Sequence, residues 1–216
     1  MIEAGIGWPS IVVDVDLTRR AADSLPAGAV YRAFAVFLHF DYLRRMNLLT
    51  PNIEPFFRDA GWAPGRAVVV DSHVPRAHPA FRILQAFGEL TVGHTGAGAE
   101  CASSDIEFGC PACPDEQVHG WQEALHTHFV CLGDVHHGHA QLWLDSQGRL
   151  FSNGLVAPIM LFVGHDFAQG VEALLKGYRL RPMLLPSQEE VMVWGERFRT
   201  GDPLVLTPGF FHARAL

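Results

Sequence analysis

The sequence predicts a globular domain that mixes helices with strands, and three observations support this fold class. First, 49% of the 216 residues are hydrophobic and only 18% are charged, which is typical of a chain that buries a core. Second, segments whose apolar residues have helical spacing alternate along the chain with short segments that are β-branched or that alternate between apolar and polar residues. Third, residues 139–151 place a turn between two runs of strand character, which predicts a β-hairpin. A chain of this length buries an adequate core without disulfides.

The first fifty residues are expected to form an extension with two elements. Ile11–Val15 alternates weakly and predicts a short strand. Tyr31–Met46 has apolar residues at helical spacing and ends with Arg44 and Arg45, whose charges favour the carboxyl end of a helix. The segment Asn47–Pro51 then breaks this helix.

Four elements are expected between residues 53 and 94. Ile53–Ala60 predicts a short helix that ends at Gly61. Apolar spacing predicts a second helix at Pro79–Phe87. β-branched or apolar runs predict strands at Ala67–Val70 and Leu90–His94.

The second half of the chain predicts further helices and strands. In chain order these are a helix at Asp115–His126, a strand at Phe129–Leu132, a hairpin of His139–Leu144 with Arg149–Phe151, a buried strand at Val156–Val163 and a helix at Asp166–Tyr178. Ser187 and Glu190 form a capping-box pattern that predicts a last helix to Phe198. Pro203 and Pro208 predict an irregular tail after it.

Negative charge is concentrated in the middle of the chain. The protein has 23 acidic and 16 basic residues, a net charge of −7, yet no lysine or arginine lies between Arg82 and Arg149. An acidic field of this kind repels nucleic acid and anionic headgroups and speeds association with a cationic partner. The alternative is a solvated acidic face that only keeps the protein soluble.

Neither a membrane span nor a secretory signal is expected. The chain has no run of 18 apolar residues, and its first residues lack a basic segment followed by an apolar one. We therefore expect a cytoplasmic protein whose partners are neither membranes nor nucleic acids.

The sequence lacks the motifs of several common enzyme classes. It contains no G-x-S-x-G elbow, no H-E-x-x-H helix, no Walker motif and no dinucleotide-binding fingerprint. Pairs of carboxylates are present, but their spacing alone does not indicate a shared cleft. No catalytic residue and no required cofactor are therefore predicted.

The cysteines provide a pattern that suits a metal. Cys110 and Cys113 form a C-x-x-C that can direct two thiolates at one tetrahedral ion, and Cys101, His94 or His119 would complete a structural zinc site. A loop with free cysteines, or a redox-sensitive pair, fits the same pattern because a second C-x-x-C is missing.

Four tryptophans are expected to be core residues or half-buried anchors, namely Trp62, Trp121, Trp143 and Trp194. Only a tryptophan on an exposed face would act as a binding hot spot. The sequence alone does not distinguish among the four.

Several local patterns follow one another in an order that resembles a known family. They are the A-G-W-x-P-G-R segment at Ala60–Arg66, the helix end at Ala86–Leu90, the strand start at Gly138–Ala140, the D-x-x-G hairpin within Leu144–Phe151, and the segment Val163–Gly177. In this order they resemble the third subgroup of the SUKH superfamily of bacterial immunity proteins. The resemblance covers roughly residues 53–178.

The resemblance implies an α+β fold with a central, mainly antiparallel sheet and flanking helices. It also implies an antitoxin of a polymorphic toxin system, which inhibits a cognate toxin by stoichiometric binding rather than by catalysis. Such toxins are often nucleases or nucleic-acid deaminases. We accordingly expect a SUKH-like domain at residues 53–180, an extension at 1–52 packed on its core, and a C-terminal helix and tail at 181–216.

Seven residues of the family motifs are expected to hold the fold. The glycines would serve turns, and the tryptophan would pack in the core. These residues are Gly61, Trp62, Gly65, Arg66, Gly138, Asp145 and Gly148.

The acidic middle of the chain suits a toxin whose surface is basic because it handles nucleic acid. The candidate interface residues are Asp105, Glu107, Asp115, Glu116, Glu123 and Asp134. Two other hypotheses remain open. One is a metal-dependent enzyme that uses the cysteines and histidines as ligands, and the other is a zinc-containing scaffold that binds a protein other than a toxin.

Overall fold

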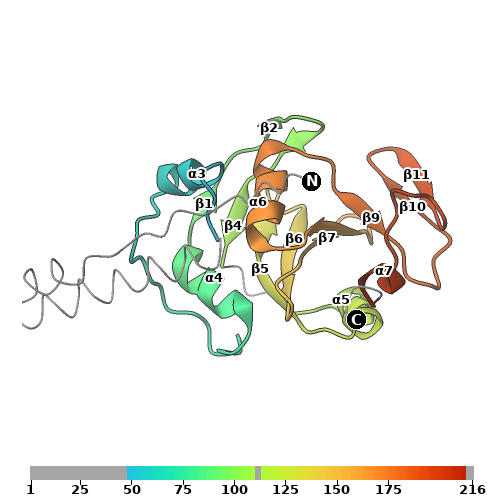
Figure 1. The fold of residues 1–216 in the computed structure, drawn as a ribbon, viewed down its shortest axis with the longest axis horizontal. Helices are drawn as coiled ribbons and strands as arrows, with labels where there is room; N and C mark the ends of the chain where they lie inside the picture. The colour runs from blue at the N-terminus through green and yellow to red at the C-terminus, as the bar shows by residue number, and fades with distance from the viewer. Residues whose placement is uncertain (1–47, 110–112, 213–216) are drawn as a thin grey trace, which may run out of the picture.

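The computed structural model describes residues 48–109 and 113–212 (Figure 1). The helices there are α3 (Glu54–Asp59), α4 (Pro79–Phe87), α5 (Glu116–Leu125), α6 (Phe167–Lys176) and α7 (Pro208–His212). The strands are β1 (Thr91–Val92), β2 (Gly96–Ala97), β3 (Ala102–Ser103), β4 (Ile106–Phe108), β5 (Phe129–Val135), β6 (Ala140–Asp145), β7 (Leu150–Gly154), β8 (Met160–Gly164), β9 (Arg181–Met183), β10 (Glu190–Val193) and β11 (Glu196–Arg199).

The central feature of the fold is an antiparallel sheet of seven strands in the order β1-β4-β5-β6-β7-β8-β9. From β4 to β9, the order of the strands in the sheet is the same as their order along the chain. Each connection therefore joins two adjacent antiparallel strands. Two small ladders, β2 with β3 and β10 with β11, lie outside this sheet. The α+β class with a mainly antiparallel sheet is thus confirmed.

The sheet separates two hydrophobic cores, because successive side chains of a strand point to opposite faces. On one face, Leu142 and Leu144 of β6 belong to the core that α3, α4 and α6 cover. On the other face, Trp143 of the same strand belongs to the core that α5 and α7 cover. Figure 1 shows α4 and α6 in front of the sheet, with α5 and α7 together at its lower end.

Four phenylalanines from four elements form the centre of the first core. Phe87 of α4 stacks on Phe167 of α6, with ring centroids 5.5 Å apart and planes 4° apart. Phe57 of α3 lies 4.6 Å from Phe87, and Phe108 of β4 lies 5.9 Å from it. Aromatic pairs of this kind contribute about 0.5–1.5 kcal/mol beyond the burial of their area. The cluster therefore ties three helices to the sheet.

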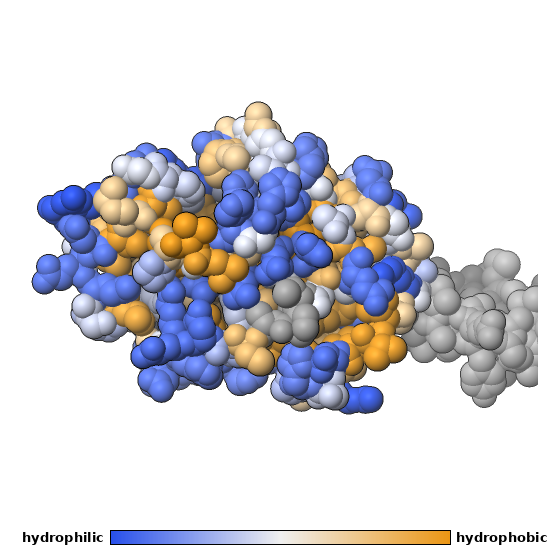
Figure 2. Space-filling view, turned by 180° about the vertical axis from the view of Figure 1, so that it is seen from behind, coloured by the Kyte–Doolittle hydropathy of each residue, from blue (hydrophilic) through white to orange (hydrophobic). Residues whose placement is uncertain are grey.

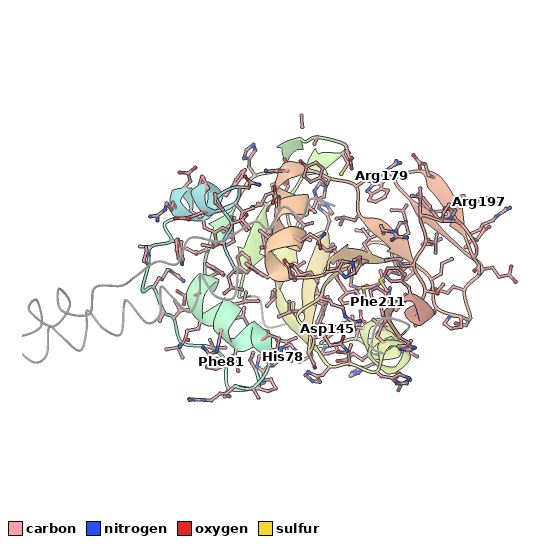
Figure 3. The ribbon with its side chains drawn as sticks, viewed as in Figure 1. His78, Phe81, Asp145, Arg179, Arg197 and Phe211 are labelled. Atoms are coloured by element: carbon pink, nitrogen blue, oxygen red, sulfur yellow. The ribbon has the colours of Figure 1, made fainter. Side chains whose placement is uncertain are left out.

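A buried ion pair closes the turn between β6 and β7. The carboxylate of Asp145, which is fully buried, accepts hydrogen bonds from the backbone N–H groups of Gln147 and Arg149, and from Nε of Arg149 at 2.6 Å. The guanidinium of Arg149 also lies over the ring of Phe211 in α7, 4.9 Å from its centroid. Figure 3 shows Asp145 and Phe211 at the same end of the sheet. The pair therefore links the central hairpin to the C-terminal helix.

The remaining motif residues also take part in the fold. The glycines at positions 61, 65, 138 and 148 all have positive φ, a region where a residue with a Cβ is strained. Trp62 is buried in the first core. The guanidinium of Arg66 donates a hydrogen bond to the carbonyl oxygen of Ala86 in α4 at 3.1 Å. These contacts hold the segment between α3 and α4 against the core.

The hairpin and most of the predicted helices and strands from residue 53 to 178 are found. The helix at Pro79–Phe87 has the predicted bounds, and the hairpin of β6 and β7 lies where its turn sequence placed it. The N-caps of α5 and α6 are Asp115 and Asp166, each of which accepts a hydrogen bond from a backbone N–H of its helix.

Two predicted strands are wrong or too long. Ala67–Val70 forms no strand, although its residues are β-branched, because Val69 points into solvent and the segment pairs with no other strand. The predicted strand Val156–Val163 begins only at Met160, since the preceding residues form an exposed loop between β7 and β8.

The last predicted helix is also wrong, because the residues that follow Ser187 form the hairpin of β10 and β11. Its two-residue turn consists of Trp194 and Gly195, with φ of 53° and 78°. Positive φ at both turn residues is the geometry that matches the twist of a tight hairpin. Val193 and Phe198 are buried while their neighbours are exposed, so the alternation of a strand outweighs the capping pattern here.

Other expectations concern residues beyond those described. The strand at Ile11–Val15 and the helix at Tyr31–Met46 lie outside the described residues, as does most of the extension at 1–52. Every helix within residues 48–109 and 113–212 is too short or too polar to span a bilayer.

Loss of the buried ion pair should destabilise the protein strongly. Asp145→Asn leaves the Arg149 guanidinium, with a side chain 9% exposed, without its counter-charge, and the expected loss in free energy of unfolding is about 3 kcal/mol. Urea unfolding followed by circular dichroism measures this loss. The control is Glu54→Gln, which removes the exposed ion pair with Arg58 and should cost less than about 1 kcal/mol. Equal losses for the two variants would contradict the structural role of Asp145.

Candidate functional site

Two carboxylates in the acidic middle of the chain form ion pairs with arginine, Glu89 with Arg66 and Asp145 with Arg149, but four others form none in the described residues. Outside it, glutamates contact a cation at 2.5–3.2 Å in the pairs Glu54–Arg58, Glu172–Lys176, Glu190–Arg199 and Glu196–Arg179. Glu107, Glu116, Glu123 and Asp134, by contrast, form no ion pair within the described part of the chain. Their charges therefore remain available to a partner.

Two of these free carboxylates are neighbours across two strands. Glu107 of β4 is opposite Asp134 of β5, and Asp134 is opposite Gln141 of β6. Ile106 and Phe108, on either side of Glu107, point into the first core. Glu107 and Asp134 must therefore face the other side of the sheet, which is the side of α5.

The helix α5 presents the other acidic residues. Val118, Trp121 and Leu125 point into the second core, and Glu116 and Glu123 are exposed. Asp115 is exposed too, but its Oδ1 accepts a hydrogen bond from the N–H of Val118 at 2.8 Å and so caps the helix. We call the set of Glu107, Asp115, Glu116, Glu123 and Asp134 the acidic surface.

The acidic surface lies on one side of the sheet, opposite α4 and α6. Figure 2 views the molecule from behind and shows hydrophilic side chains over much of this face, with separate hydrophobic patches between them.

Asp105 does not belong to this surface, because its side chain is only 12% exposed. Its Oδ1 accepts hydrogen bonds from Thr95 Oγ1 at 2.7 Å and from the backbone N–H of His137 at 3.2 Å. Burial acts to raise the pKa of Asp105, but the hydrogen bond from Thr95 and the contacts with His137 outweigh it and lower this pKa below its ordinary value. The carboxylate of Asp105 therefore orders the loop of His136 and His137.

The predicted zinc ligands are only partly described. Cys101 is half-buried, and its Sγ lies 3.6 Å from the carbonyl oxygen of Tyr178, while burial and Glu100 raise the pKa of its thiol. Cys113 is exposed, and His119 contacts Gln122 on α5. No group of three potential ligands occurs within residues 48–109 and 113–212. Cys110 lies outside the described residues, so the zinc site stays a prediction.

A hydrophobic groove lies between α6 and the tip of the β10–β11 hairpin. Trp194 at this tip is 44% exposed, whereas Trp62, Trp121 and Trp143 are buried. The guanidinium of Arg179 lies 5.4 Å from the centroid of the Trp194 ring. The groove has a volume of about 270 Å³, and its lining includes Leu161, Tyr178, Leu180 and Trp194. The sequence does not reveal this groove, because its lining residues come from segments that are far apart along the chain.

The internal role of Asp105 predicts a specific dependence on pH. A carboxylate whose pKa is lowered by folding stabilises the protein above its unfolded-state pKa of about 3.9, and this contribution is lost as the pH falls through the folded-state pKa. Asp105→Asn should therefore lower the free energy of unfolding by about 1 kcal/mol at pH 6. The difference from the wild type should shrink toward pH 2.5.

Urea unfolding at pH 6, 4 and 2.5 measures this difference. The control is Asp59→Asn, which changes an exposed carboxylate outside any ion pair in the described residues. A deficit of Asp105→Asn that stays constant over this range would contradict the assigned role.

Comparison with known proteins identifies the family. A search of curated proteins found no match, and neither did a search of solved structures. A family model described as SUKH-3 immunity protein matches residues 49–177, which is more than half of the chain. This match spans the elements from α3 to α6, including the motif residues and the whole acidic surface. The chain therefore belongs to the SUKH-3 immunity protein family.

Proposed function

We propose that this immunity protein neutralises a cognate toxin by direct, stoichiometric binding through the acidic surface. The observation that carries the proposal is the set of carboxylates on one side of the sheet without ion pairs in the described residues. Family membership supplies the role of an immunity protein, and the charge distribution supplies the chemistry of the partner.

The partner that fits this surface is a protein with a basic face. Exposed carboxylates without ion pairs in the described residues, such as Glu107, Glu116 and Glu123, gain electrostatic attraction without breaking ion pairs there. Complementary charge also speeds the diffusional encounter, which matters for an inhibitor that must bind a toxin before the toxin acts. Toxins that cleave or deaminate nucleic acids need basic surfaces to hold their substrate. A nuclease or nucleic-acid deaminase is therefore the proposed toxin class.

The same charge argues against nucleic acid as a direct ligand. Phosphates would be repelled by a surface where no lysine or arginine occurs between Arg82 and Arg149. The protein would instead occupy the basic face of the toxin and so exclude the nucleic acid from it. In the proposed role the protein needs no catalytic group, and its proposed location is the cytoplasm, where such a toxin meets its substrate.

Affinity capture is the first experiment. The tagged full-length protein is immobilised, lysate of its native cells is applied at low salt, and the column is eluted with increasing salt before mass spectrometry. The expected result is a basic toxin domain that is retained in stoichiometric amount and elutes more readily as salt rises. Recovery of the protein alone, or of a partner with an acidic face, would overturn the proposal.

Charge reversal on α5 should slow the association with the captured toxin. Glu116→Lys with Glu123→Lys is expected to lower the association rate constant about tenfold at low salt and to reduce its dependence on salt. Stopped-flow or surface-based kinetics at several salt concentrations measures both effects.

The matched control is Asp59→Lys with Glu189→Lys, which changes the net charge equally at exposed positions away from the acidic surface. Circular dichroism first establishes that both double variants are folded. An equal loss of association rate in both would show that net charge, and not the acidic surface, determines binding.

A further inference from the structure

A row of polar side chains crosses the sheet on the side of α5. Strand pairing places Glu107 of β4 opposite Asp134 of β5, Asp134 opposite Gln141 of β6, and Gln141 opposite Asn153 of β7. We call these four residues the polar row. The next residue across the sheet is Met160 of β8, which is buried in the second core and ends the row.

The carboxylate end of the polar row is unfavourable in the free protein. Like charges directly opposite each other on neighbouring strands destabilise a sheet. Asp134 also has a buried carboxylate oxygen, Oδ1, without a hydrogen-bond partner in the described residues. A buried acceptor that forms no hydrogen bond is costly to a folded protein. A cationic hydrogen-bond donor beside the two carboxylates would relieve their repulsion.

The amide end of the polar row is an independent observation. Asn153 is only 1% exposed, yet neither its Oδ1 nor its Nδ2 has a hydrogen-bond partner in the described part of the protein. A side chain that is buried with both polar atoms unpaired is uncommon, and it indicates a site that a ligand or a rearrangement completes. Gln141 lies between Asn153 and Asp134, and its amide can hydrogen-bond to both neighbours.

We propose that the polar row binds the side chain of an arginine from the partner. This inference rests on the proposed function and names the chemistry that the acidic surface recognises. The guanidinium has a planar array of five N–H donors that matches carboxylate oxygens in a bidentate manner, so it neutralises Asp134 and Glu107 together. The bound cation also orients Gln141, whose amide then hydrogen-bonds to Asn153.

Arginine is the occupant that the geometry favours over lysine. An ammonium group is a compact point charge with three donors, whereas two carboxylates on adjacent strands present several acceptors spread over about 5 Å. Arginine is also enriched among the residues that contribute most to binding energy at protein interfaces. The polar row is therefore the energetic centre of the acidic surface, and the carboxylates on α5 chiefly affect the association rate.

A titration of the isolated protein tests the proposal without the toxin. The ¹⁵N-labelled full-length protein is titrated with Nα-acetyl-arginine amide, with the lysine analogue and with sodium chloride at equal ionic strength. The expected result is saturable shifts of the Glu107, Asp134 and Gln141 backbone amides, and of the Asn153 side-chain amide, with millimolar affinity for arginine. Lysine should bind at least threefold more weakly.

Variants locate the binding in the polar row. Asp134→Asn should weaken arginine binding at least tenfold, and the matched control Glu189→Gln, which removes one exposed carboxylate outside the acidic surface, should leave it unchanged. Shifts that do not saturate, that sodium chloride reproduces, or that Asp134→Asn retains would overturn the proposal.

Stability provides a second readout that needs no ligand. Because Asp134→Asn removes the charge opposite Glu107 and the unpaired buried carboxylate oxygen, its melting temperature should rise by about 1–3 °C. A lower melting temperature would show that an internal partner holds the carboxylate and would overturn the proposal.

Failure of the arginine site and failure of the immunity function are distinguishable. If the arginine titration is negative but the captured toxin still binds and depends on Glu116 and Glu123, only the arginine site is wrong. If arginine binds to the polar row but no toxin is captured, the site stands and the proposed function does not.

Discussion

The buried ion pair of Asp145 and Arg149 is the interaction on which the arrangement of this protein depends. It fixes the turn of the central hairpin, because one carboxylate accepts two backbone hydrogen bonds and the charge of the arginine. The same arginine contacts the aromatic ring of Phe211, so the C-terminal helix is packed against the turn. Strand pairing then spreads outward from this hairpin to both edges of the sheet. The positions of Glu107 and Asp134 follow from that pairing, and the position of α5 follows from its packing in the second core.

Much of the fold could be predicted from the sequence where local and global preferences agree. The hairpin of β6 and β7 has both strand alternation and turn residues, and α4 has apolar spacing between clear ends. The segment after Ser187 could not be predicted in this way, because a capping pattern favours a helix while packing favours a hairpin. Burial of Val193 and Phe198 against the rest of the protein decides the outcome, and no local rule contains that information.

The candidate site could be predicted only in part, for a similar reason. The sequence shows which carboxylates lack nearby basic residues along the chain, but exposure and cross-strand pairing are tertiary properties. Asp105 is the example of failure, because it belongs to the acidic segment and yet is used inside the protein. Glu107 and Asp134 are 27 positions apart in sequence and become neighbours only through strand register.

The strand β9 and the second core have a consequence for how this family domain is delimited. The family match ends at residue 177, whereas the sheet continues through β9, which pairs with β8. A chain cut at the end of the match would expose the backbone hydrogen-bonding groups of β8 along an open sheet edge. It would also uncover Phe162, which packs on Phe211 at 5.2 Å. An open edge beside exposed aromatic rings is a template for self-association. The residues after 177 therefore complete the domain, because β9 covers the edge of β8 and Phe211 covers Phe162.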